Sequence, residues 1–281
     1  MRAVRAATRP ATWVALAMIG GLPFGGVPAA HAQGTAAAPA GAATSQVWSP
    51  PQRRRIILMR HGDVAYFDAQ GKPVADPDKV VLSDKGKAQA DASGAYLKTI
   101  GVTKVDRVLS SNLARTIETA ERVLAAAGIA GKPEQVDALR EMRNGPSKDI
   151  ATADLPKALL ALVAPRAPGD TRFLGKESVA ELQGRIAPAL KVLLDDKGWD
   201  TAVLVLHALV NNVILSTALT GDASYYGRFD HGAGCFAIID VGADFSDAVI
   251  KAVNVCPDPS PYGSRLHELE RLLGQAMKAR Q

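Results

Sequence analysis

The stretch Ile56-Ile57-Leu58-Met59-Arg60-His61-Gly62 decides the fold and also points to a site. Its first four residues form a short, unbroken apolar run, which predicts a strand buried on both faces. A guanidinium and an imidazole follow where this strand ends. Functional residues of parallel sheets gather beyond the carboxyl ends of the strands. Polar residues that follow the other strands should therefore lie close to Arg60 and His61.

The rest of the chain alternates apolar runs with helical patterns. Strands are expected at 105–109, 201–206, 235–241 and 248–255, and helices at 83–100, 113–127, 177–196 and 208–219. This alternation predicts an α/β fold, a three-layer α/β/α sandwich around a mostly parallel sheet. The C-terminal stretch shows an apolar stripe at helical spacing, which is expected to pack on the domain, with an oligomer contact as the alternative. Its members are Leu266, Leu269, Leu272, Leu273 and Met277.

Charged and imidazole side chains follow the predicted strands. Arg115 lies one turn into the helix after the second strand, Glu141 follows a short third strand, and His207 ends the clearest buried strand. A parallel sheet would bring these three residues to Arg60 and His61. A lone histidine at such a place is usually a core residue, but two with charged companions at one sheet edge indicate chemistry.

Phosphoryl transfer suits this set of side chains. The planar donor forks of Arg60 and Arg115 match the non-bridging oxygens of a phosphate. A neutral imidazole such as that of His61 is a competent nucleophile near neutral pH. Glu141 can protonate a leaving oxygen and then activate water. Cations and dipoles already offset the phosphate charge, so neither a metal nor a cofactor is demanded.

Five motifs occur in order along residues 55–242. They are Leu58-Met59-Arg60-His61-Gly62, Leu82-Ser83-Asp84-Lys85-Gly86-Lys87-Ala88-Gln89-Ala90, Ser110-Ser111 with Arg115, Thr119 and Ala120, Gly175-Lys176-Glu177-Ser178, and Val203 to His207. Together they resemble the histidine phosphatase superfamily, also called phosphoglycerate mutase-like. The resemblance implies the phosphoglycerate mutase-like α/β fold and a mechanism that proceeds through a phosphohistidine.

The resemblance also implies a role for each matching residue. His61 would be the nucleophile. Arg60, Arg115 and His207 would bind the phosphoryl group, with His207 protonated and acting as a donor. Glu141 would be the general acid, as in branch 1 of the family.

Two positions depart from the family pattern. Ala208 stands where the other branch has an acidic residue, which favours branch 1, but the family usually has Gly there. Asp63 would repel phosphate if it pointed inward, so it is expected to point away. The longer polar motif of the family's mutases is missing after Gly62, which favours hydrolysis over transfer. Two alternatives stay open: a catalytically weak protein that binds a phospho-ligand or polyanion on the same fold, and a phosphoglycerate mutase-like phosphotransferase.

Two interpretations stay open for His231, and two for the pair Cys235 and Cys256. His231 either lines the mouth of the pocket and contacts substrate, or is a loop histidine paired with Asp230. Cys235 and Cys256 lie at opposite ends of the last two strands. If these strands pair as an antiparallel hairpin, the two cysteines lie opposite each other, at a Cα separation that a disulfide can span. Two buried free thiols are the alternative.

The amino terminus accounts for the basic character of the chain, which carries a formal charge of +5 and a pI near 9.2. Residues 1–32 resemble a signal peptide, with three arginines, an apolar run and a cleavage pattern ending at Ala32; a retained membrane anchor is the alternative.

Residues 33–54 are expected to be a disordered Ala/Gly/Pro-rich tether, with Arg53 to Arg55 as a solvated lead-in, and residues 55–281 the histidine phosphatase domain.

The domain itself is close to neutral, with a formal charge of −1 from residue 56 onward. The sequence therefore predicts an exported protein, periplasmic or secreted, with no nucleic-acid partner and no membrane span after cleavage. Its expected partner is a small phosphorylated substrate, and the oligomeric state is left open.

Overall fold

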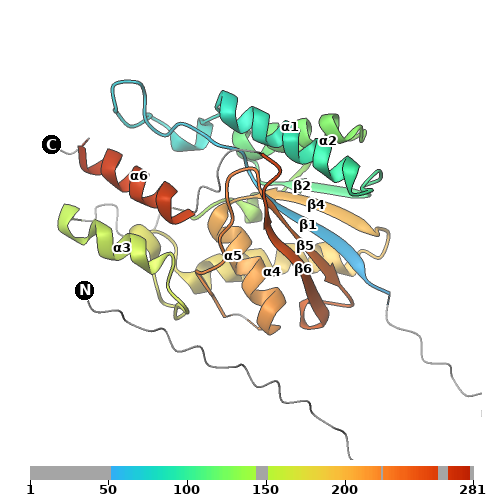
Figure 1. Cartoon of the computed structure of the whole chain (residues 1–281). Coiled ribbons are helices and arrows are strands. Elements are labelled where there is room, and N and C mark those ends of the chain that lie inside the picture. The colour runs from blue at the N-terminus through green and yellow to red at the C-terminus, as the bar shows by residue number, and fades with distance from the viewer. Residues whose placement is uncertain (1–51, 144–150, 223, 259–264, 279–281) are drawn as a thin grey trace, which may run out of the picture. The chain divides into compact units, whose positions relative to one another are not determined.

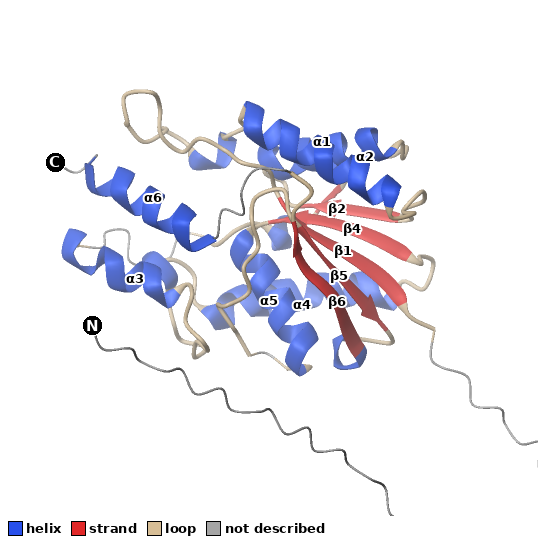
Figure 2. Ribbon diagram, viewed as in Figure 1, coloured by secondary structure: helices blue, strands red, loops and turns tan. Residues whose placement is uncertain are grey.

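Six strands form one mixed sheet in the order β3-β2-β4-β1-β5-β6 (Figure 2). The strands β3, β2, β4 and β1 run parallel to one another. The β5–β6 hairpin extends the sheet, with β5 antiparallel to β1. The computed structural model describes residues 52–143, 151–222, 224–258 and 265–278. The strands are β1 (Arg54–Arg60), β2 (Arg107–Ser110), β3 (Glu134–Gln135), β4 (Thr201–Leu206), β5 (Phe236–Val241) and β6 (Ala248–Val255). The expected α/β fold with a mostly parallel sheet is confirmed.

Helices cover both faces of this sheet, as Figure 1 shows. On one face lie α1 (Asp84–Thr99) and α2 (Ala114–Ala127), and on the other α4 (Val179–Asp195) and α5 (Ala208–Thr220). The shorter α3 (Leu155–Ala161) and the C-terminal α6 (Arg265–Lys278) lie side by side at the end of the sheet where β1 and β4 finish.

The alternation of side chains along β1 explains these layers. Ile56 and Leu58 pack into the core under α4 and α5, whereas Ile57 and Met59 pack under α1 and α2. All four are fully buried, as an unbroken apolar run requires. Ser83 begins α1 by accepting a hydrogen bond from the amide of Gly86, at 3.1 Å.

The arginine run at the start of β1 corrects one expectation. Arg54 belongs to the strand and is 7% exposed. Its guanidinium lies 4.2 Å from the centre of the Trp199 ring and donates to two carbonyl oxygens at the end of α4. Each flanking arginine pairs with a carboxylate: Arg53 with Asp247, and Arg55 with Asp240. The run is therefore part of the domain rather than a solvated lead-in, since its charges already have partners.

A disulfide closes the β5–β6 hairpin. Phe236 pairs with Val255 across the two strands, which places Cys235 and Cys256 opposite each other just outside them. Their Cα atoms are 4.5 Å apart and their sulfurs are bonded. The opposed placement expected from the sequence is thus what brings the two sulfurs together.

Several expectations fall outside the described residues. These are the signal peptide at 1–32, the tether up to residue 51, and the side chains of Leu266 and Leu269 on α6. Within the part of the chain that is described, no helix is both long and apolar enough to cross a membrane.

Candidate active site

The turn after β1 holds His61 in one tautomer. Nδ1 of its ring lies 2.8 Å from the carbonyl oxygen of Gly62. A carbonyl oxygen only accepts, so Nδ1 carries the hydrogen and Nε2 keeps a free lone pair. The turn needs glycine, because a Cβ on Gly62 would lie 2.4 Å from the carbonyl oxygen of Gly86. The amide of Gly62 donates to Thr119 Oγ1 at 3.1 Å, which ties the turn to α2.

The two predicted histidines lie beside each other. The ring centres of His61 and His207 are 5.2 Å apart, edge to face, and both rings are buried. Burial, followed by the charges of Arg60 and Arg115, lowers the pKa of His61 to about 3. Burial and the same cationic surroundings hold the pKa of His207 well below its usual value. These shifts favour the neutral form of both rings, and a His207 that becomes protonated beside a bound phosphoryl group stays a prediction.

The arginines complete a cluster of donors. Arg60 is 7% exposed and Arg115 is 4% exposed. Among the described residues, the Nε atoms of both arginines and Nδ1 of His207 are buried without a hydrogen-bond partner. Buried polar atoms without partners are costly, and the two arginine N–H groups at this sheet edge are donors that an anion can satisfy. Throughout the described residues, no three His, Cys, Asp or Glu side chains gather as metal ligands.

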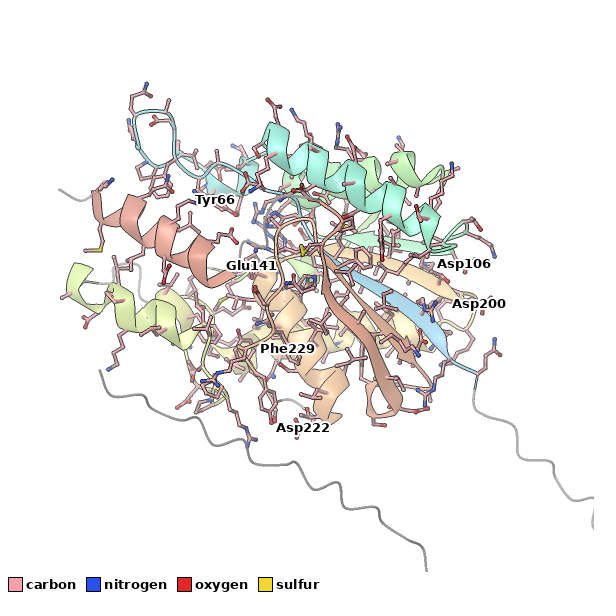
Figure 3. All side chains as sticks on the ribbon, in the orientation of Figure 1. Tyr66, Asp106, Glu141, Asp200, Asp222 and Phe229 are labelled. Atoms are coloured by element: carbon pink, nitrogen blue, oxygen red, sulfur yellow. A yellow bond between two sulfur atoms is a disulfide. The ribbon has the colours of Figure 1, made fainter. Side chains whose placement is uncertain are left out.

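Glu141 lies at the wall of an adjoining cavity. This cavity has a volume of about 650 Å³ and is lined by residues that include Tyr66, Arg115 and Glu141. The carboxylate accepts hydrogen bonds from the amides of Met142, at 3.1 Å, and Leu209, at 3.4 Å. Figure 3 shows Glu141 and Tyr66 toward one end of the sheet, with Asp106 and Asp200 at the opposite end. Glu141 thus places a carboxylate in the wall of the cavity that Arg115 also lines.

A buried ion pair supports the Glu141 loop from behind. Arg185 of α4 donates through Nε and Nη2 to the carboxylate of Glu177, both at 2.8 Å. The same guanidinium donates to the carbonyl oxygens of Ala138, at 2.5 Å, and Glu141, at 3.1 Å. Glu177 also accepts from the amide of Arg143 at 3.2 Å. The Gly-Lys-Glu-Ser motif therefore fixes the backbone that carries Glu141.

Comparisons with known proteins show the family and the fold. The model of the histidine phosphatase superfamily (branch 1) matches residues 56–254. The chain belongs to this family. A probable phosphoglycerate mutase GpmB of Salmonella paratyphi A is 26% identical over 179 residues, covering 59% of this chain and 74% of the relative.

Solved structures share the fold. A putative alpha-ribazole-5'-P phosphatase from Escherichia coli aligns with a TM-score of 0.55 at 22% identity, covering 72% of this chain and 96% of the other. A mycobacterial glucosyl-3-phosphoglycerate phosphatase aligns with a TM-score of 0.55 at 23% identity, covering 72% and 99%. At these identities the likeness concerns the fold.

Of the two alternatives for His231, the burial of its ring speaks against the one in which it lines the mouth of the pocket. Its ring is fully buried, with Nε2 3.0 Å from the carbonyl oxygen of Cys235. Its own carbonyl oxygen accepts from Nη1 of Arg60 at 3.1 Å. The backbone at His231 therefore lies behind Arg60 and accepts one of its hydrogen bonds. Asp63 points away from the donor cluster as expected, because its carboxylate accepts from the hydroxyl of Ser83 at 2.7 Å.

The sequence reasoning missed two contacts of this site. Arg185 carried no signal, because a charge on a long amphipathic helix usually faces solvent. Glu268 of α6 reaches Arg60 with both carboxylate oxygens, at 2.7 and 2.8 Å. Burial alone would raise the pKa of Glu268, but the charge and hydrogen bonds of Arg60 lower it to about 2. No local pattern could have shown this pair, since the two residues are 208 positions apart.

Proposed function

We propose that the protein hydrolyses phosphomonoesters through a phosphohistidine on His61, with Glu141 as the general acid and base. The observation that carries the proposal is the fixed tautomer of His61. Its Nδ1–H bonds to Gly62, so Nε2 is unprotonated beside Arg60 and Arg115. A nucleophile held neutral next to unpaired donors is what attack on a bound phosphate requires.

The proposed reaction has two steps. In the first, Nε2 of His61 forms a bond to phosphorus as the ester P–O bond breaks, and protonated Glu141 gives its proton to the leaving oxygen. In the second, ionised Glu141 takes a proton from water, the resulting hydroxide attacks phosphorus, and the P–N bond breaks. Orthophosphate leaves, and both residues return to their starting forms.

The cavity beside Glu141 supports a small leaving group. Its volume of about 650 Å³ suits the non-phosphate part of a metabolite-sized ester. Its wall carries cationic and anionic side chains together, among them Arg140, Arg143 and Asp137. A small polar phosphorylated compound therefore fits better than an apolar one.

Turnover and trapping of the phosphoenzyme test the nucleophile. The purified protein is assayed for orthophosphate release across a broad panel of phosphomonoesters from acid to neutral pH, and a radiolabelled substrate is used to trap an acid-labile phosphoenzyme. We expect turnover in the wild type and no phosphoenzyme in His61→Ala. A protein without turnover on the whole panel, or a phosphohistidine in the variant, contradicts the proposal.

The leaving-group dependence tests Glu141. We expect Glu141→Gln to slow an alkyl phosphate by about 10²-fold or more and a nitrophenyl phosphate far less, because only the poor leaving group needs the proton. Glu121→Gln, which removes an exposed carboxylate from α2, is the matched control. Equal slowing of both substrates by Glu141→Gln would count against the acid role.

Phosphoryl transfer is the second candidate, because the curated relatives carry the name of a probable phosphoglycerate mutase. A mutase would require a bisphosphorylated primer and would release little orthophosphate. A primer requirement in the same assay would favour transfer. Tight vanadate binding without turnover would instead favour a phospho-ligand binding protein.

We propose further that the protein is exported to the periplasm or secreted. The leader-like residues 1–32 and the disulfide between Cys235 and Cys256 support this, since disulfides persist in oxidising compartments. Fractionation of cells, with the amino terminus of the recovered protein sequenced, tests the proposal. A cytoplasmic protein that still begins at Met1 would overturn it.

A further inference from the structure

The C-terminal helix places a carboxylate on the phosphate-binding arginine. Glu268, in the first turns of α6, meets Nη1 and Nη2 of Arg60 at 2.7 and 2.8 Å. The side chain of Arg60 is 8% exposed and that of Glu268 is 24% exposed. This is a two-pronged, charge-assisted contact in a partly buried site, and such contacts are the strong ones.

The contact uses the same donors that a phosphate would use. Nη1 of Arg60 also donates to the carbonyl oxygen of His231, so both terminal nitrogens are engaged. A phosphate held by the fork of Arg60 would place its negative oxygens where the carboxylate of Glu268 lies. Two anions cannot share that fork without strong repulsion. Phosphate and Glu268 therefore compete.

The carboxylate satisfies only part of the donor cluster. In the described part of the chain, the Nε atoms of Arg60 and Arg115 and Nδ1 of His207 stay buried without partners beside it. A phosphate has more acceptor oxygens than a carboxylate and more charge, so it can engage donors that Glu268 leaves unpaired. Exchange of one anion for the other is thus favoured when phosphate is present.

The location of α6 makes such an exchange compatible with the fold. This helix belongs to neither layer that covers the sheet; it lies against α3 at the end of the sheet (Figure 1). Its displacement would leave the β1–β4 and β1–β5 pairings intact. Glu268 also keeps some exposure, so it can leave into solvent without unfolding its surroundings.

We propose that Glu268 is an intramolecular competitor of the substrate phosphate: α6 holds its carboxylate on Arg60, and a bound phosphoryl group displaces it. The inference rests on the proposed function in one respect, namely that Arg60 binds the phosphoryl group. It makes α6 an autoinhibitory element that sets the substrate concentration at which the enzyme works.

Binding of inorganic phosphate to the full chain tests this competition. We expect Glu268→Gln and Glu268→Ala to bind orthophosphate about tenfold more tightly than the wild type by titration calorimetry, equivalent to about 1.4 kcal/mol. Glu270→Gln removes an exposed carboxylate from the same helix and should bind like the wild type. Unchanged or weaker phosphate binding in both Glu268 variants would overturn the proposal and make the ion pair a structural brace.

A second measurement on the unsubstituted protein covers the case in which the variants fold poorly. Hydrogen exchange of residues 265–278 is followed with and without saturating orthophosphate. We expect faster exchange with phosphate, because the helix loses its anchor. Unchanged or slower exchange would refute displacement. Neither experiment measures turnover. A protein in which phosphate competes with Glu268 but which hydrolyses no phosphomonoester would therefore contradict only the proposed function.

Discussion

The pair between Glu177 and Arg185 offers a quantitative test of how Glu141, the proposed general acid, is positioned. Their side chains are 9% and 12% exposed, and Arg185 also holds the backbone of the Glu141 loop. Removing one partner of a buried pair leaves the other charge uncompensated, which costs about 3–5 kcal/mol. We therefore expect Arg185→Met to lower the free energy of unfolding by that amount, and Glu177→Gln by about 2 kcal/mol, since Gln keeps some hydrogen bonds.

The assay is a double-mutant cycle measured by urea denaturation. We expect the double variant to be less destabilised than the sum of the singles, with an interaction energy of about 2–3 kcal/mol. The pair between Lys191 and Asp195 is the control, because it lies on the same helix with side chains 73% and 63% exposed. Its cycle should give less than about 0.5 kcal/mol.

The same variant should also act on catalysis. A loop shifted by about 1 Å costs up to about 10²-fold in rate, so we expect Arg185→Met to slow an alkyl phosphate by that order. A nitrophenyl phosphate should be slowed far less, since it does not need the proton of Glu141. Additive energies in the cycle, or equal slowing of the two substrates, would refute the reasoning.

Three further outcomes concern pH, the amino-terminal strand and the hairpin. The pKa of His61 is about 3 in the folded protein and near 6.5 when unfolded, so the unfolded chain holds the extra proton between these values. Above pH 6.5 this group does not change the free energy of unfolding with pH. Between pH 6.5 and about 3, acidification lowers the free energy of unfolding by about 1.4 kcal/mol per pH unit. Urea melts of His61→Asn should therefore show a free energy of unfolding that depends less steeply on pH. Arg54→Met should cost about 3 kcal/mol in the same melts, whereas the more exposed Arg55→Gln should cost under about 1 kcal/mol; equal effects would contradict the burial described for Arg54. Replacing both Cys235 and Cys256 by serine should lower the free energy of unfolding by about 3 kcal/mol, and a variant as stable as the oxidised wild type would contradict this.

Much of the fold and the reactive part of the site could be predicted from local sequence. The unbroken apolar run before Arg60 and the one before His207 are both buried parallel strands, and neighbouring parallel strands necessarily end at the same edge. Geometry then brings the polar residues that follow them together. Local pattern was sufficient here because each of these residues is placed by its own strand.

The residues that the sequence misplaced, left open or missed depend on contacts between distant segments. Arg54 looks solvated in a run of three arginines, but the end of α4 supplies two carbonyl oxygens and Trp199 supplies a ring. The sequence left His231 open between the pocket mouth and a loop pairing, and the antiparallel addition of β5 to β1 buries that loop behind Arg60. Glu268 depends on where α6 lies, which no local periodicity specifies.

The central position of β1 has a consequence for the order of events during synthesis. Arg55 pairs with Thr201 on one side, and Arg54 pairs with Val241 on the other. β1 is synthesised first, but its pairing partners come from the last third of the chain. The amide of Arg60 likewise cannot form its hydrogen bond until Cys235 has been synthesised. Such long-range pairing makes folding slow, because loop closure must precede the contacts that reward it. A nascent chain has no assembled phosphate site, so the proposed exported enzyme would remain unfolded and inactive until nearly all of it has emerged.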